Sequence, residues 1–167
     1  MMKIRNIKCS FITNGLVREG LKRSETYKFV LDEATIFIFG HSPNRLNVTG
    51  LKSAEDVEHY VRVIETKFNI KCTDVKIDNI FISHKDSKNI KLSNVYHYAK
   101  EKFSHLYLVD YNVELFPGMF LKPKDKKYPT IILFRTGSFQ LMGGKDLPSI
   151  LEAHQIVNDI IDYFVNV

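Results

Sequence analysis

Two asparagines recur at equivalent positions of the sequence, and their side chains can make specific hydrogen bonds. Asn6 lies in the segment IRNI, and Asn79 lies in the segment IDNI 73 residues later. An amide offers both donors and an acceptor, and the hydroxyl of Thr49 adds a further polar group on the same side of the predicted strands. Each asparagine alone would more often be a solvated strand residue, so their recurrence in register is the evidence for a shared role.

Aromatic side chains accompany these polar groups on two strand-like segments, 35–39 and 130–134, which are apolar on both faces. Successive side chains of a strand point to opposite faces, so helices that cover one face leave the other uncovered. The residues on that outer face are Phe37, Phe39, Ile132 and Phe134. Amides and hydroxyls beside aromatic rings suit the minor groove of DNA, where A·T pairs offer only acceptors and apolar side chains open base steps. Alternatively, a dimer partner or short helices bury these strands on both faces.

Catalytic and metal-binding patterns are absent from the sequence. The six histidines show no HExxH or paired-ligand spacing, Gly143-Gly144-Lys145 lacks the spacing of a P-loop, and no GxSxG motif occurs. The two cysteines, Cys9 and Cys72, form no CxxC pair. We therefore expect neither an enzyme nor a bound cofactor or metal.

The composition fits a small globular protein with an anionic partner. The chain has 167 residues, 44% of them hydrophobic, and a formal charge of +5, which is too modest to establish nucleic-acid binding by itself. No stretch approaches the roughly 18 apolar residues of a membrane span, so we expect no membrane partner. We expect an intracellular protein, in the nucleus or, if the source is a virus, in a cytoplasmic viral factory.

The chain consists of two unequal repeats, which we place at 1–70 and 71–167. Segment 35–39 is matched by 130–134, and Gly50-Leu51-Lys52 is matched by Gly143-Gly144-Lys145. The distance from the asparagine to the matched strand is 29 positions in the first repeat and 51 in the second, so the first repeat lacks 22 residues. Internal repetition of this kind indicates two copies of one structural unit.

Each repeat ends in an amphipathic helix that must cover a sheet. The first is predicted at about 53–68, because Ser53 and Asp56 have the spacing of a capping box. The second is predicted to begin at Pro148, a favoured first-turn residue. Strands are predicted at 3–12, 27–32, 34–40, 45–50, 73–83, 118–123, 129–136 and 138–143. Hairpin turns are predicted at Asp32-Glu33 and at 124–127, and shorter helical signals lie near 15–24 and 91–102.

The run Glu114–Gly118, followed by Thr130–Phe134 and Gly144-Lys145, resembles the second repeat of the TATA-binding protein (TBP) family. The first repeat is similar to that family through Asn6-Ile7 and Val48–Asp56, and the likeness spans nearly the whole chain. The resemblance implies an α+β fold, namely a TBP-like saddle of two pseudo-symmetric repeats. Its curved antiparallel sheet would carry helices on the convex face and double-stranded DNA under the concave face.

The resemblance also implies roles for individual residues. Asn6 and Asn79 would hydrogen-bond bases, assisted by Thr49, and Phe116 would wedge a base step together with Phe134. Lysines at 122–127 lie in a hairpin that is either a solvated turn or a phosphate contact. The full set of predicted DNA-binding residues is Asn6, Lys8, Phe37, Phe39, Arg45, Asn47, Thr49, Asn79, Phe81, Phe116, Pro117, Lys122, Ile132, Phe134, Gln140 and Met142.

Two departures from the family pattern affect this interpretation. Phe39 lacks the expected second phenylalanine, because the position across from it is near Thr26 and the 22-residue deficit removes an edge strand with its stirrup loop. The predicted floor is also more polar and bulky than in the family, with Lys8, Phe81, Asn47, Gln140 and Met142 on it. Sequence specificity for a TATA element therefore does not carry over directly.

Glu114 and Leu115 lie at the tip of the stirrup retained in the second repeat. The resemblance implies that a basal transcription factor of the TFIIB type, which bridges to RNA polymerase, docks there. Two functions stay open: an initiation factor that binds and bends A/T-rich promoter DNA, and a saddle-shaped protein-interaction module with weak or no autonomous DNA binding. A saddle attached to nuclease chemistry, as in type-three ribonucleases H, would need a catalytic domain for which we expect no room in 167 residues.

Overall fold

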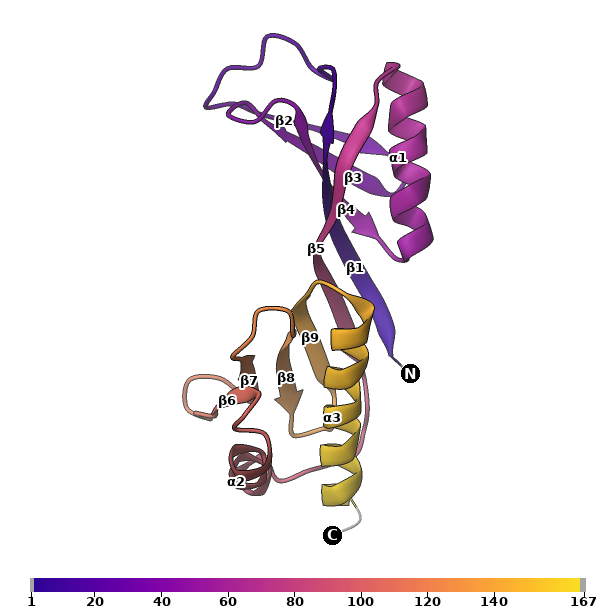
Figure 1. The fold of residues 1–167 in the computed structure, drawn as a ribbon. Coiled ribbons are helices and arrows are strands. Elements are labelled where there is room, and N and C mark those ends of the chain that lie inside the picture. Colours follow the sequence, from indigo (N-terminus) through magenta and orange to yellow (C-terminus); the bar gives the residue numbers. More distant parts are fainter. Residues whose placement is uncertain (1, 166–167) are drawn as a thin grey trace. The chain divides into compact units, whose positions relative to one another are not determined.

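The computed structural model describes residues 2–165, which fold into antiparallel strands and helices grouped in two compact units (Figure 1). The first unit comprises Ile4–Asn79, and the second comprises the chain from Ile80 onward together with the first residues of the chain. Within the described residues the elements are β1 (Lys3–Thr13), β2 (Thr26–Leu31), β3 (Ala34–Phe39), β4 (Arg45–Leu51), α1 (Ala54–Phe68), β5 (Cys72–His84), α2 (Leu92–Lys102), β6 (Tyr107–Asp110), β7 (Gly118–Pro123), β8 (Thr130–Phe134), β9 (Phe139–Gly144) and α3 (Leu147–Val165).

In the first unit the strands lie in the order β2-β3-β4-β1, and α1 runs along one of their faces (Figure 1). Burial alternates along β3 and β4, so that Ile36, Ile38 and Val48 are fully covered on the helix side. The edge-to-face contact between Phe29 of β2 and Phe68 of α1, with ring centroids 5.9 Å apart, marks the same side.

Helix α1 has well-defined ends, which explain why it forms where the sequence predicts. The Ser53 hydroxyl accepts the backbone N–H of Asp56, and the Asp56 carboxylate accepts the backbone N–H of Ser53, so the capping box is confirmed. The Asp56 pKa is lowered, first by the backbone N–H of Lys52 that donates to its carboxylate. Asn69 ends the helix in the left-handed conformation, with φ 52°.

In the second unit the strand order is β5-β9-β8-β7-β6, and α3 packs over β9 and β8 while α2 contacts β6 and α3. The core lies between α3 and the strands. Gly144 allows a close approach of α3, because a β-carbon there would lie 2.6 Å from Ile150. None of the helices in residues 2–165 has the length and apolar character needed to cross a membrane.

All eight predicted strands are present with boundaries within two residues of the prediction, as are the three helices and the two-residue turn at Asp32-Glu33. The helical signal near 91–102 is confirmed as α2. The signal near 15–24 is wrong, because those residues form bends and turns. Gly15 and Gly20 break the helical pattern there, with φ 70° at Gly20, and the Arg18 guanidinium lies 5.1 Å from the Tyr27 ring.

Strand β6 is absent from the prediction, because its four residues give too short an alternation to read. Its place in the fold explains the unequal repeats. In the second unit the connection between β5 and β7 holds α2 and β6, whereas the described connection between β1 and β2 in the first unit, residues 14–25, holds no helix or strand. The deficit of the first repeat therefore falls on a helix and an edge strand.

Candidate nucleic-acid interface

Each unit has one strand face that its long helix does not cover, here called its open face. In the first unit the open face is formed by Lys8, Ser10, Lys28, Phe37, Phe39, Asn47 and Thr49. In the second unit it is formed by Phe81, Ser83, Phe120, Ile132, Phe134, Gln140 and Met142. The predicted orientation of Phe37 and Phe39, away from the helix, agrees with the alternating burial of β3. In β8 the three central residues are all buried, and Phe134 at the end of the strand is half-buried.

A row of four paired residues crosses each open face at equivalent register, and we call it the cross-strand row. In the first unit the row is Lys28, Phe37, Asn47 and Ser10. In the second unit it is Phe120, Ile132, Gln140 and Ser83. The residues at the row's two central positions, Phe37 with Asn47 and Ile132 with Gln140, were all predicted as contacts. The residues at the ends of the rows were not among the predicted contacts: Lys28, Ser10, Phe120 and Ser83. The alternation within 27–32 and 118–123 would have placed Lys28 and Phe120 on this face.

A β-bulge interrupts the strand pairing at the same place in both units. Lys8 alone stands opposite Thr49 and Gly50, and Phe81 alone stands opposite Met142 and Gly143. Both glycines have positive φ, 96° at Gly50 and 81° at Gly143, the conformation that glycine adopts without steric cost. The bulges turn Lys8 and Phe81 to equivalent positions, so the repeat holds at the level of individual residues.

Asn6 and Thr49 are brought together at the first bulge. The Asn6 Oδ1 atom accepts the Gly50 backbone N–H at 2.7 Å, and the Asn6 amide and the Thr49 hydroxyl are hydrogen-bonded at 3.0 and 3.1 Å. Asn6 therefore has a structural role, because its side chain accepts the backbone N–H of Gly50 at the bulge. Its amide nitrogen carries two N–H groups, and Thr49 occupies one of them, so one donor is left for a ligand.

A shallow hollow of about 240 Å³ lies on the open face of the first unit, lined by Lys8, Phe37, Phe39, Asn47, Val48 and Thr49. Cationic groups surround it. The Lys28 ammonium lies 5.7 Å from the centre of the Phe37 ring, and Arg45 donates to the Ser10 hydroxyl at 3.2 Å. Five of the predicted DNA contacts thus line one hollow, and a sixth, Arg45, contacts the buried Ser10 of the same face.

An aromatic cluster occupies the open face of the second unit. The Phe116 ring centroid lies 5.0 Å from that of Phe120 and 6.0 Å from that of Phe134, and Phe116 is 36% exposed. Gly118 makes room for these rings, because a β-carbon there would lie 2.7 Å from the Phe116 ring. Ile132, predicted as a contact, is only 7% exposed and offers a ligand little surface.

Lys122, which we predicted as a DNA contact, is paired with a carboxylate in the structure. Its ammonium forms an ion pair with the Asp110 carboxylate of the neighbouring strand at 2.8 Å, and it lies 5.6 Å from the Phe120 ring. The pair is solvent-exposed, so a phosphate can compete for the lysine. No sequence pattern indicates this pair, because β6 is too short to be recognised.

The connection 111–117 presents an exposed apolar tip. Asn112 shapes it by accepting the Glu114 backbone N–H on its side chain and those of Leu115 and Phe116 on its carbonyl oxygen. Leu115 is 83% exposed, Val113 is 64% exposed, and Glu114 and Pro117 are exposed beside them.

Asn79, the second predicted asparagine contact, is half-buried near the end of the first unit.

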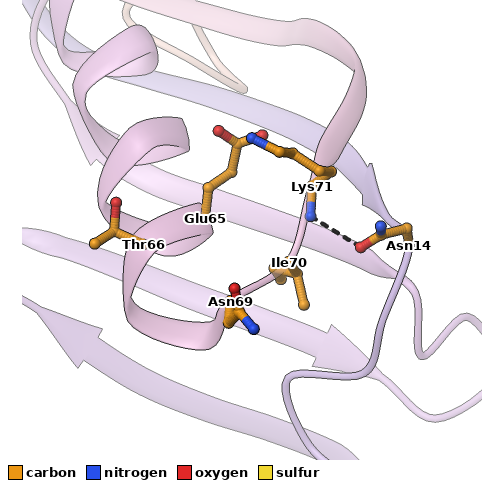
Figure 2. Close-up of a pocket in the computed structure, with 6 residues that line it drawn as sticks. All are labelled: Asn14, Glu65, Thr66, Asn69, Ile70 and Lys71. Atoms are coloured by element: carbon orange, nitrogen blue, oxygen red, sulfur yellow. Dashed lines mark hydrogen bonds between the residues drawn. The ribbon is translucent and has the colours of Figure 1, made fainter.

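A polar hollow lies beside the C-terminal end of α1, and the side chains in it serve to bind the local backbone (Figure 2). It is lined by Asn14, Glu65, Thr66, Asn69, Ile70 and Lys71. Asn14 accepts the Lys71 backbone N–H at 2.8 Å, and Glu65 accepts the Cys72 backbone N–H at 2.8 Å. These bonds tie the end of α1 to the chain that follows β1. Within residues 2–165 no group of three or more His, Cys, Asp or Glu side chains is placed to hold a metal ion.

The fold and the open faces define the class: an α+β protein with an internally repeated antiparallel strand unit, each unit backed by a long helix. Residues 74–164 match the family model described as "Transcription factor TFIID (or TATA-binding protein, TBP)". The match covers more than half of the chain, and the chain belongs to the TATA-binding protein family, a family of transcription factors.

Solved structures agree with this assignment. The chain is similar to Methanococcus jannaschii TBP with a TM-score of 0.67 and 19% identity, over 97% of this chain and 98% of that one. The predicted TBP-like fold is therefore confirmed. A match to a chain of the complex of A. aeolicus tRNASec with M. kandleri SerRS has a TM-score of 0.43 and 12% identity, over 99% of this chain and 31% of that chain, and is too weak to define a fold. A comparison with curated protein sequences finds no significant match.

Proposed function

We propose that this protein is a transcription-initiation factor that binds A/T-rich promoter DNA through the minor groove and bends it with phenyl wedges. The observation that carries the proposal is the cluster of exposed Phe116 with half-buried Phe120 and Phe134 on a strand face that the long helix does not cover. These rings already shield part of their apolar area by touching one another, and a partner that covers the cluster would remove the rest from water. Membership of the TBP family supports DNA as that partner.

The polar residues of the open faces favour A/T-rich sequence. The remaining amide N–H of Asn6 can donate to the acceptors that adenine and thymine present in the minor groove. The guanine amino group is itself a donor, so at a G·C pair it would face the remaining amide N–H of Asn6, donor against donor. Asn79 occupies the equivalent position of the second repeat and is given the same role.

Cationic residues of the first unit supply contacts to phosphate. Lys28 lies over the Phe37 ring, which lines the hollow, and Arg45 donates to the Ser10 hydroxyl of the same face. Neutralising phosphates releases counterions, so binding weakens with salt. We expect this unit to contribute most of the salt dependence, because Lys122 of the second unit is already paired with Asp110.

The exposed tip at Glu114 and Leu115 is proposed as the docking site for a basal factor of the TFIIB type, which recruits RNA polymerase. Leu115 supplies exposed apolar surface that a partner would cover, and Glu114 supplies charge beside it. Charge reversal by Glu114→Lys should reduce assembly of the ternary complex and leave binary DNA binding intact. Simultaneous loss of both activities would contradict this assignment of the tip.

A mobility-shift assay tests the DNA-binding proposal. Duplexes of A/T-rich and G/C-rich sequence are compared at matched salt, with the wild type, Asn6→Ala, and His59→Ala as a matched surface control on α1. We expect the wild type and His59→Ala to prefer A/T-rich DNA and Asn6→Ala to lose part of that preference. Equal affinity of the wild type for both duplexes would refute minor-groove reading of A/T sequence.

A second candidate function is that of a protein-interaction module of a transcription complex. Lys8 and Lys28 favour this second function. Their ammonium groups lie beside the hollow and would have to lose water if the minor groove of DNA covered them. In that case the basal factors bind the chain in the absence of DNA, and no duplex is shifted by the protein alone. The same assay, run with and without those factors, separates the two functions.

A further inference from the structure

At one end of the open face of the first unit, Phe39 stacks on the imidazole ring of His41. The ring centroids are 5.6 Å apart and the planes are inclined by 22°. At the equivalent end of the second unit, Phe134 meets Phe116 at 6.0 Å with an angle of 55°. In both units one ring belongs to the last residue of a strand, β3 or β8, and the other belongs to a flanking loop.

The turn that carries His41 is fixed by the main chain around it. The Gly40 backbone N–H donates to the Glu25 carbonyl at 2.8 Å, and the Ser42 N–H donates to the Phe39 carbonyl at 2.9 Å. A β-carbon on residue 40 would lie 1.8 Å from the Lys22 carbonyl oxygen, so the loop 14–25 packs directly on Gly40. These contacts hold the turn in place, and the side chain of His41 is exposed on it.

The two aromatic residues of strand β2, which is paired with the strand that carries Phe39, lie on the helix-covered face. Phe29 contacts Phe68 of α1, and Tyr27 lies 5.6 Å from Phe29 on the same, helix-covered side. The residue paired with Phe39 across the hairpin is Thr26, which has no ring. Of the residues that the structure describes, His41 is the one whose ring is in stacking contact with Phe39.

We infer that His41 takes the place of the absent first-repeat phenylalanine and forms with Phe39 the wedge at this end of the DNA site. The inference rests on the proposed function and deepens it. An imidazole offers less apolar surface than a phenyl ring, and its nitrogens bond to water or to base edges. The first-unit wedge therefore opens its base step less than the all-phenyl wedge of Phe116 and Phe134.

The test measures base unstacking at both ends of one site. An A/T-rich duplex, selected by repeated binding from a random-sequence library, carries the fluorescent base 2-aminopurine at one position after another. Its fluorescence rises where a step is opened. The wild type is compared with His41→Ala, Phe39→Ala, Phe116→Ala and His41→Phe, with His59→Ala on α1 as the matched control, and circular dichroism checks the folding of each variant.

We expect two opened steps with the wild type. His41→Ala and Phe39→Ala should lower the signal at the same step, roughly threefold or more, while Phe116→Ala lowers the other. His41→Phe should keep or raise the first signal, and His59→Ala should change neither. Two outcomes would overturn the role of His41 and leave the proposed function standing. In the first, two steps open and neither responds to His41→Ala. In the second, a single step opens and depends only on Phe116. No opened step and no A/T-rich sequence selected would refute both.

Discussion

The open faces of the two units share a register and differ in chemistry. Where the second unit places the ring of Phe120, the first unit places the ammonium of Lys28, and where the second bulge carries Phe81, the first carries Lys8. Hydrogen-bonded strand pairs and glycine bulges depend on the backbone, so both units keep them. Residues on an uncovered face are not constrained by packing in the core. Their types can therefore differ between the two units according to what each face contacts.

Under the proposed function, this difference gives the two units different roles. Opening a base step requires apolar surface, which the packed rings around Gly118 offer. Contacts to phosphates require long cationic side chains, which the first unit offers in Lys28 and Arg45. We therefore expect the second unit to dominate bending and the first to dominate salt dependence.

The largest expected effect is on bending. Opening a base step costs a few kcal/mol, which the wedge must recover through contact, so removing a ring of the larger cluster should matter most. Phe116→Ala should reduce the DNA bend more than Phe39→Ala. Fluorescence transfer between end-labelled duplexes measures the bend, and an equal or greater effect at Phe39 would contradict the division of work.

A second prediction concerns the stability of the aromatic cluster. Gly118→Ala places a methyl group against Phe116, Ile132 and Phe134, and overpacking of this kind costs about 1–3 kcal/mol. Thr26 is the equivalent, exposed residue of the first unit, so Thr26→Ala should change the free energy of unfolding by less than about 0.5 kcal/mol. Urea denaturation of both variants checks this, and similar losses would show that the cluster is not tightly packed.

A third prediction exchanges the chemistry at the first bulge. Lys8→Val replaces a charged contact by an apolar one, so DNA binding should become less dependent on salt and, at about 0.3 M salt, tighter. The slope of log affinity against log salt, measured for this variant and for Lys67→Ala at the end of α1 as a control, gives the answer. Weaker binding of Lys8→Val at all salt concentrations would make Lys8 a contact residue in its own right.

The smallest expected effect is a pH dependence confined to the second unit. Burial lowers the pKa of His154 below its ordinary value of 6.5, assisted by His84. The folded protein thus prefers neutral His154, whose Nδ1 atom lies 3.2 Å from the Asn158 amide. Because the unfolded chain binds the proton more readily, stability should fall as pH drops below about 6.5.

Val61 of α1 is the counterpart of His154 under the repeat that aligns Gly50 with Gly143. His154→Val should therefore flatten the decline in stability between neutral and mildly acidic pH. Thermal unfolding from pH 7.5 to 5 compares the variant with the wild type. An unchanged decline in the variant would place the acid sensitivity elsewhere.

Local patterns in the sequence determined most of the secondary structure. The capping box of Ser53 and Asp56, the turn at Asp32-Glu33 and the alternation of Phe37 and Phe39 each act over a few residues, so a single segment contains the whole signal. The repeated asparagines likewise indicated that the chain contains two copies of one unit. The predicted TBP-like fold followed from the order of these elements and is confirmed.

Only the tertiary structure decided which side chains meet. The rings around Ile132, the pairing of Lys122 with Asp110 and the stacking of His41 on Phe39 depend on how strands and turns distant in sequence come side by side. β6 was too short to be recognised, and without it Lys122 had no visible partner. Hydrophobic periodicity records which side of an element is covered, whereas contacts between uncovered side chains arise from long-range register that no local pattern contains.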